Sequence, residues 1–79
     1  MGKKTGILGY NYDEKRIGIL SFDLWVKGKE GLHCGETFEV LVNDEWVADR
    51  IEFTSMTNEW YLVYSKLSGD QLEGLKVRY

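Results

Sequence analysis

The 79-residue chain has no proline, one cysteine and one histidine, and these scarcities exclude several classes of protein. A single cysteine cannot form a disulfide within the chain, and one histidine with one cysteine falls short of a structural zinc set. A small domain without disulfides or metal depends on its hydrophobic core for stability. Three tryptophans, five tyrosines and three phenylalanines provide large side chains for that core. The unpaired thiol favours a reducing compartment.

Long apolar runs are also missing. No stretch approaches the roughly 20 residues that a membrane helix needs, and no apolar segment of a secretory signal peptide follows the Met-Gly-Lys-Lys start. The chain has no repeat, linker or low-complexity segment. We therefore expect a single domain over residues 1–79 that is cytoplasmic and not associated with a membrane.

The lone histidine and cysteine are adjacent in the stretch GLHCG at residues 31–35. A cysteine nucleophile needs a base within hydrogen-bond reach, but neighbouring side chains of an extended chain point to opposite faces. His33 and Cys34 therefore cannot form a dyad. We predict that Leu32 and Cys34 face the core. His33 then points outward, near Glu36. We expect no enzymatic activity, no bound metal and no other cofactor.

The chain is predicted to fold as a series of short strands separated by turns. Apolar or alternating segments fall at 5–10, 16–22, 36–42, 45–53, 59–65 and 75–79. Residues 68–73 are long enough for one helical turn before the last strand. Residues 23–30 suit either a strand end or a loop. Five or six antiparallel strands with one helical turn indicate an all-β SH3-like barrel, with an OB-like barrel as the alternative. In an SH3-like barrel the last strand pairs with the first.

A hairpin is predicted over residues 36–54, with Asn43-Asp44 as its two-residue turn because both residues tolerate positive φ. This turn pairs Leu41 with Trp46 on the outer face. An exposed leucine–tryptophan pair among acidic residues is typical of a protein-binding patch. Its alternative is a cover for the barrel end or a second small core. The predicted patch comprises Leu41, Trp46, Glu39, Glu45 and Glu52.

The same register sets Phe38 opposite Asp49, which is a poor pair for a core. Ile51 and Phe53, further along the same strand, are typical core residues. We therefore predict a bulge or bend near residues 48–49, where one extra residue restores the apolar face.

Charge is unevenly distributed along the chain. Residues 30–59 carry eight acidic residues and one arginine, or −7, whereas the remainder carries nine basic and five acidic residues, or +4. Basic side chains near both termini indicate an alternative function, nucleic-acid binding, in which Tyr10 or Tyr12 stacks on bases. The residues predicted for this surface are Lys3, Lys4, Lys15, Arg16, Lys76 and Arg78.

Several short motifs give the chain a family resemblance. They are Leu-His-Cys-Gly-Glu at 32–36, Glu-Trp at 45–46, Arg-Ile-Glu at 50–52, Trp-Tyr-Leu-Val at 60–63 and Leu-Glu-Gly-Leu-Lys-Val-Arg at 72–78. With these motifs the chain resembles a family of small uncharacterised proteins from Gram-positive bacteria, their phages and other mobile elements. Asp44 departs from the glycine usual in that family, and residues 22–29 match loosely. The resemblance implies no activity, only an accessory role in mobile DNA.

Together these observations predict a non-enzymatic protein-interaction module, an accessory protein of a phage or mobile element. One specific version is an inhibitor of a host defence nuclease, whose acidic surface occupies a basic nucleic-acid channel. We expect a protein partner first and nucleic acid second. The protein itself is expected to be a monomer or a weak homo-oligomer.

Overall fold

The structure, a computed structural model, describes residues 4–79 and contains seven strands and one short 3₁₀ helix in that range. The elements are β1 (Thr5–Asn11), β2 (Arg16–Ser21), β3 (Leu24–Trp25), β4 (Thr37–Val42), β5 (Glu45–Thr54), β6 (Glu59–Leu62), η1 (Gly69–Leu72) and β7 (Lys76–Arg78). The all-β class and the helical turn before the last strand are confirmed. No helix among the described residues is long and apolar enough to cross a membrane.

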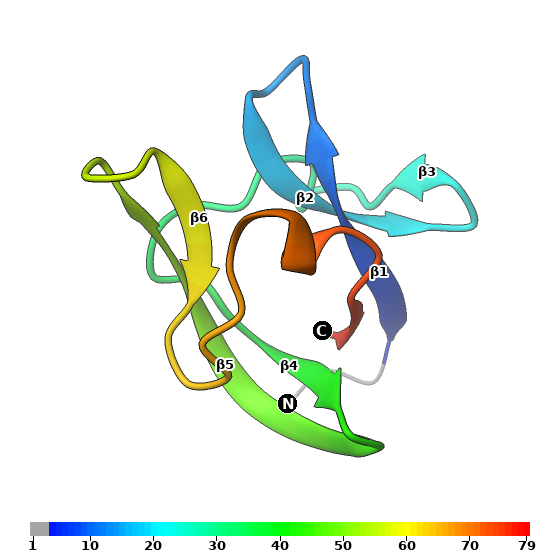
Figure 1. The fold of residues 1–79 in the computed structure, drawn as a ribbon. Coiled ribbons are helices and arrows are strands. Elements are labelled where there is room, and N and C mark those ends of the chain that lie inside the picture. The colour runs from blue at the N-terminus through cyan, green and yellow to red at the C-terminus, as the bar shows by residue number, and fades with distance from the viewer. Residues whose placement is uncertain (1–3) are drawn as a thin grey trace.

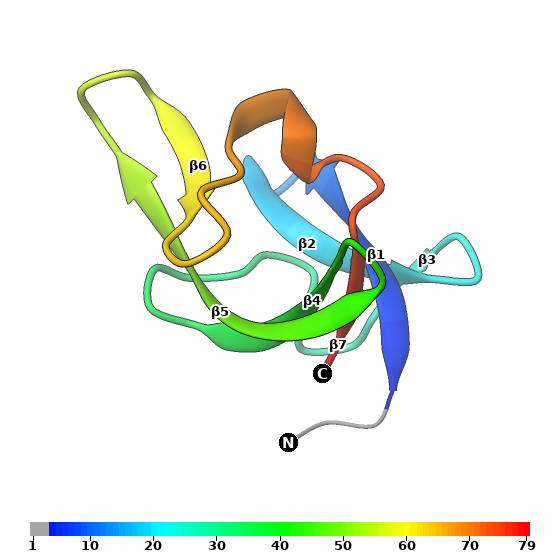
Figure 2. The same ribbon diagram turned by 60° about the horizontal axis from the view of Figure 1, so that its bottom comes forward.

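The strands form one antiparallel sheet in the order β3-β2-β1-β7-β4-β5-β6 (Figure 1). β7 lies in the middle, where it pairs with β1 on one side and with β4 on the other. The predicted pairing of the last strand with the first is therefore confirmed. Figure 2 shows the sheet curling around η1. Within residues 4–79 the edge strands β3 and β6 do not pair with each other, and the seven strands exceed the predicted five or six.

β1 and β2, the first two of the predicted strand segments, form an antiparallel hairpin with Gly9 opposite Gly18. A second tight turn follows, in which Phe22 and Asp23 have φ angles of 53° and 65°. This turn leads into the short strand β3, so residues 23–30 divide into a turn, a two-residue strand and a loop. Positive φ is uncommon for a bulky residue, and Phe22 is 97% exposed at this turn.

The loop after β3 runs along the outer edge of β2. Ile19 N–H donates to Lys29 O at 2.9 Å, and Leu32 N–H donates to Ile17 O at 2.7 Å. The loop thus satisfies backbone groups of β2 that the two residues of β3 do not reach. Residues 29–32 are held close to the β2 backbone as a result.

The hairpin of β4 and β5 has the predicted turn and register. Asn43 and Asp44 both have positive φ, 51° and 65°, as a two-residue turn requires. Leu41 pairs with Trp46 across the two strands. The short-range turn chemistry of the sequence is sufficient to set this pairing.

Of the bulge or bend predicted near residues 48–49, the bulge is wrong, because the register continues through Phe38 and Asp49 without interruption. β5 is one curved strand that passes from β4 to β6 after Arg50 (Figure 2). Asp49 is 2% exposed. Its Oδ1 accepts hydrogen bonds from the N–H groups of Arg50 and Tyr64, both at 2.8 Å, and its Oδ2 accepts one from Ser65 N–H at 3.0 Å. Three backbone donors therefore compensate for burying the carboxylate opposite an aromatic side chain.

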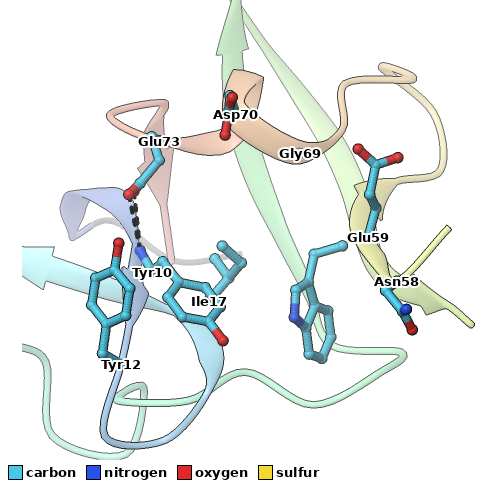
Figure 3. A pocket seen from close by; sticks show the side chains of 9 residues that line it. Tyr10, Tyr12, Ile17, Asn58, Glu59, Gly69, Asp70 and Glu73 are labelled. Atoms are coloured by element: carbon cyan, nitrogen blue, oxygen red, sulfur yellow. Dashed lines mark hydrogen bonds between the residues drawn. The ribbon is translucent and has the colours of Figure 1, made fainter.

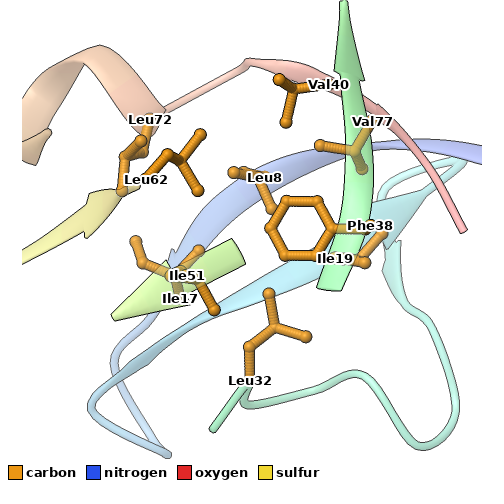
Figure 4. Packing of buried hydrophobic residues seen from close by; sticks show 10 residues of the cluster. All are labelled: Leu8, Ile17, Ile19, Leu32, Phe38, Val40, Ile51, Leu62, Leu72 and Val77. Carbon is orange, nitrogen blue, oxygen red and sulfur yellow. The ribbon is translucent and has the colours of Figure 1, made fainter. Parts of the chain in front are cut away.

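The core draws side chains from both halves of the sheet and from η1 (Figure 4). Its buried apolar residues are Leu8, Ile17, Ile19, Leu32, Phe38, Val40, Ile51, Leu62, Leu72 and Val77. Phe53, predicted to join this core, lies outside it and is 39% exposed. Its ring packs against Trp60 instead, with centroids 5.0 Å apart.

Cys34 is exposed, so the prediction of its burial is wrong. Residues 33–36 form a turn in which Glu36 N–H donates to His33 O at 3.1 Å and Gly35 has a φ of 92°. Strand alternation does not apply to a turn, and this is why the parity argument fails. The other two assignments are confirmed: Leu32 is fully buried, and exposed His33 has its Nδ1 3.4 Å from Glu36 Oε2.

We expect Cys34 to react with a chromogenic disulfide reagent in the native protein nearly as fast as in denaturant. The turn places the thiol on the surface, where the reagent meets no barrier of packing. Stopped-flow absorbance of the released thiolate measures the rate, and Cys34→Ser provides the blank. Native-state protection of more than about tenfold would contradict the exposed position.

Candidate functional site

The Leu41–Trp46 pair lies on the outer face of the hairpin, and both residues are half-buried. Arg78 from β7 covers part of the Trp46 ring. Its guanidinium carbon lies 4.5 Å from the Trp46 ring centroid, and its Nε donates to Glu39 Oε1 at 2.8 Å. The structure thus brings together three residues of the predicted patch with an arginine that was predicted for the nucleic-acid surface. The arginine covers part of the patch and offsets its negative charge.

The other two acids of the predicted patch do not join this cluster. Glu45 is exposed beside the turn at the start of β5. Glu52 is seven positions further along β5, at roughly 23 Å of extended strand, and forms an ion pair with Arg50 at 3.0 Å. The predicted patch is therefore a small cluster with two separate acids.

Hydrogen bonds lower the pKa of two glutamates within residues 30–59, Glu36 and Glu39. The hydrogen bond from Arg78 lowers the pKa of Glu39, and the same contact raises the pKa of Arg78. Partial burial acts to raise the pKa of Glu36, but the His33 N–H at 2.8 Å and Lys29 Nζ at 3.2 Å outweigh it, and the pKa falls below its ordinary value. Carboxylates paired in this way offer less free negative charge to imitate nucleic-acid phosphates.

The residues predicted for nucleic-acid binding are also divided. Lys3 lies outside the described residues. Lys4 and Lys76 are exposed beside the first half of β1. Lys15 and Arg16 are at the opposite end of that strand, in the turn and at the start of β2. Lys76 pairs with Ile7 and Arg16 with Asn11, so at least four residues of β1, roughly 13 Å, separate the two groups. The sixth residue, Arg78 of β7, is already paired with Glu39.

A cleft of about 430 Å³ lies between the β1–β2 hairpin and the segment running from β6 to η1 (Figure 3). Its lining residues are Tyr10, Tyr12, Ile17, Asn58, Glu59, Trp60, Gly69, Asp70 and Glu73. We refer to it as the Tyr12–Trp60 cleft. Its volume falls in the range of about 300–1,000 Å³ typical of ligand sites. Sequence analysis did not indicate it.

The tyrosine side of the cleft is held in place by hydrogen bonds. Tyr10 and Tyr12 share a face because side chains alternate along a strand, and their rings meet edge-on with centroids 4.9 Å apart. Glu73 accepts a hydrogen bond from Tyr10 N–H at 3.0 Å, which ties β1 to the end of η1 (Figure 3). Asn11 Oδ1 accepts one from Asp13 N–H at 3.0 Å and shapes the turn beyond Tyr12.

Trp60 lies between the cleft and a second hollow. That second hollow is lined by Arg16, Cys34 and Phe53 as well as Trp60, and none of these three lines the cleft. The Arg16 guanidinium carbon is 5.6 Å from the Trp60 ring centroid. The cation–π and aromatic contacts of the indole thus come from residues that line the second hollow and not the cleft.

The sequence contained part of the signal for this site. Tyr10 and Tyr12, predicted to stack on bases, are both in the cleft, and Trp60 had no assigned role. The acidic residues Glu59, Asp70 and Glu73 join them from β6 and the η1 region. A Tyr-x-Tyr pair at the end of a strand indicates one aromatic wall, but no local pattern shows which segment faces it.

Comparison with known proteins places the chain in a family. Residues 6–79 match the family described as Domain of unknown function (DUF5348). The chain belongs to this family. A crystal structure of a protein from Ruminococcus gnavus is also similar, with a TM-score of 0.73 and 39% sequence identity over 96% of this chain and 100% of that one. None of the curated proteins matches at a significant level. The predicted resemblance to an uncharacterised family is confirmed to this extent.

Proposed function

We propose that the protein is a non-enzymatic protein-interaction module that binds its partner in the Tyr12–Trp60 cleft. The observation that carries the proposal is the cleft itself, with three aromatic side chains and a volume suited to a side chain or short segment of a partner. Tyr12 is 80% exposed although it is aromatic. Exposed tyrosine and tryptophan side chains are the residues that most often dominate the energy of binding a protein.

The Leu41–Trp46 cluster is a weaker candidate for the same function. Both apolar side chains are half-buried, and Arg78 already contacts the Trp46 ring. This arrangement favours the alternative reading of a small secondary core over that of an open binding patch.

The narrower role of a nuclease inhibitor also has less support than the general one. Glu36, Glu39 and Glu52 are ion-paired, and Asp49 is buried, so half of the eight acids in residues 30–59 are not free to imitate phosphates. A setting in a phage or mobile element remains part of the proposal and depends on the family resemblance alone. Nucleic-acid binding, the alternative function, has less support because the described residues predicted for it fall into two groups along β1 and one arginine paired with Glu39.

We further propose that the curled sheet is an open variant of an SH3-like barrel. The pairing of β1 with β7, the single helical turn before β7 and the passage of β5 from β4 to β6 support this assignment. An OB-like barrel is the alternative.

Selection from a display library of random linear peptides tests the proposed function. We expect wild-type protein to enrich peptides whose binding in solution is weakened at least about tenfold by Tyr12→Ala. The substitution removes one wall of the cleft, and the high exposure of Tyr12 means that folding does not depend on it. Fluorescence anisotropy with the enriched peptides gives the affinities.

Tyr64→Ala is the matched control, because Tyr64 is also an exposed tyrosine, at 66%, and does not line the cleft. It should bind the enriched peptides as the wild type does. The proposal is wrong if no peptide is enriched, or if the enriched peptides bind Tyr12→Ala with unchanged affinity.

A further inference from the structure

We infer that the Tyr12–Trp60 cleft recognises an arginine side chain presented by a flexible segment of the partner. This inference deepens the proposed function and rests on it. It follows from the charge of the lining, from the aromatic walls and from the way this chain already places its own arginines.

The lining is acidic and contains no basic residue. Glu59, Asp70 and Glu73 line the cleft, whereas no lysine, arginine or histidine does. None of the ion pairs formed within residues 4–79 includes these three acids. Other glutamates of the chain, such as Glu36 and Glu39, do have cationic partners. The cleft thus carries negative charge that no cation of the described residues neutralises. A cationic ligand would provide the missing positive charge.

The three acids and the aromatic rings face the same space from different elements. In Figure 3, Tyr10 and Tyr12 stand on one side, Asn58 and Glu59 on the other, and Asp70 above them. A planar guanidinium can lie on an aromatic face while its edge donates to a carboxylate. An ammonium, which is a compact and strongly hydrated charge, cannot make both contacts as well.

The chain itself contains one example of this combined contact, and a second arginine that lies over an aromatic ring alone. Arg78 lies over Trp46 at 4.5 Å and donates to Glu39 at 2.8 Å, which combines a ring and a carboxylate on one guanidinium. Arg16 lies over Trp60 at 5.6 Å from the side of the second hollow. The cleft offers the ring and the carboxylates without the arginine. A partner's arginine would complete the arrangement that Arg78 completes on β4 and β5.

Two-dimensional NMR of the labelled full chain tests the inference with three peptides. Each is a capped Gly-Ser-X-Ser-Gly peptide in which X is arginine, lysine or citrulline, the neutral analogue of arginine. We expect the arginine peptide to shift the Trp60 indole and Tyr12 amide resonances in a saturable way. Citrulline should bind at least about tenfold more weakly because the charge is lost, and lysine should be intermediate.

Two variants locate the effect. The double substitution Glu59→Gln and Asp70→Asn neutralises two of the three exposed acids of the cleft and should weaken the arginine peptide about tenfold. Glu73 is left unchanged because it holds Tyr10 N–H. Glu45→Gln removes an exposed acid at the distant hairpin turn and should change nothing.

The outcomes separate this inference from the proposed function. Peptides that are selected by the library and depend on Tyr12, but contain no excess of arginine, overturn the inference and leave the proposed function standing. Equal binding of the arginine and citrulline peptides overturns the inference as well. Absence of any binding that depends on Tyr12 overturns both. Shifts of the same resonances by a single-stranded oligonucleotide, and not by peptides, assign the cleft to nucleic acid and also overturn both.

Discussion

Asp49→Ala is expected to lower the free energy of unfolding by roughly 3–5 kcal/mol, the largest effect of any single substitution proposed for this protein. For a domain of this size the midpoint of thermal unfolding should fall by more than about 12 °C. Such a loss is a large part of the roughly 5–15 kcal/mol that keeps a typical domain folded.

The reason lies in what the carboxylate leaves behind. Its two oxygens accept from the backbone N–H groups of Arg50, Tyr64 and Ser65 at 2.8, 2.8 and 3.0 Å. Alanine removes both acceptor oxygens, and the partly buried N–H donors of the segment after β6 then lose their partner. The same carboxylate links β5 to residues 64–65, so the substitution also loosens the return of the chain toward η1.

Chemical denaturation followed by tryptophan fluorescence measures the effect. Asp49→Asn should lose less than alanine, because an amide keeps the oxygen that meets Arg50 and Tyr64 and places an N–H₂ against Ser65 N–H. Glu45→Ala, which removes an exposed acid from the same strand, should cost less than about 0.5 kcal/mol. An Asp49→Ala cost as small as this would show that the three N–H groups find other acceptors.

Gly18→Ala is expected to cost about 3 kcal/mol, although it adds a single methyl group. A Cβ atom on residue 18 would overlap the carbonyl oxygen of Glu30 and lie 2.9 Å from both the Glu30 carbonyl carbon and Trp25 Cζ3. The Glu30 carbonyl cannot easily retreat, because Asn11 Nδ2 donates to its oxygen at 3.0 Å. Its neighbours along residues 29–32 are bonded to β2 as well. The methyl group therefore meets backbone that is fixed from two sides.

Gly9→Ala is the matched control, since Gly9 lies directly opposite Gly18 in the same hairpin. The nearest atom to its new Cβ would be Leu20 Cδ1 at 2.9 Å, the end of a flexible side chain, and the next contacts are at 3.8 Å. We expect a cost below about 1 kcal/mol. Equal costs for the two alanines in denaturant unfolding would mean that the loop beside β2 gives way, contrary to its hydrogen bonds.

Local patterns in the sequence were sufficient for much of the fold. The Asn43-Asp44 turn determines the register of β4 and β5, and that register places Leu41 beside Trp46. The alternation of Leu75, Val77 and Tyr79 correctly indicates which face of the last segment meets the core. In each case the cause lies within a few residues of its effect, so the pattern is visible before folding.

The prediction for Asp49 failed, and the cleft was missed, because their causes lie far apart in the sequence, whereas the prediction for Cys34 failed through a local turn. Asp49 is tolerated in the core because of N–H groups fifteen and sixteen positions later, which no strand-pairing argument includes. Cys34 was predicted to be buried from strand alternation, but it lies in a turn that is closed by the hydrogen bond between His33 and Glu36. The cleft joins residues 10–17, 58–60 and 69–73, which meet only after the whole sheet has formed. Its tyrosines could be recognised as candidates, but the acids opposite them could not.

The central position of β7 has a consequence for how the sheet forms while the chain is being synthesised. Until residues 76–78 have been synthesised, β3-β2-β1 and β4-β5-β6 are two separate three-stranded pieces. Each then presents a bare strand edge, β1 in one and β4 in the other, that can pair with any neighbouring nascent chain. The complete sheet therefore cannot form before residues 76–78 are available. The same three residues that complete the sheet also cover both of these edges.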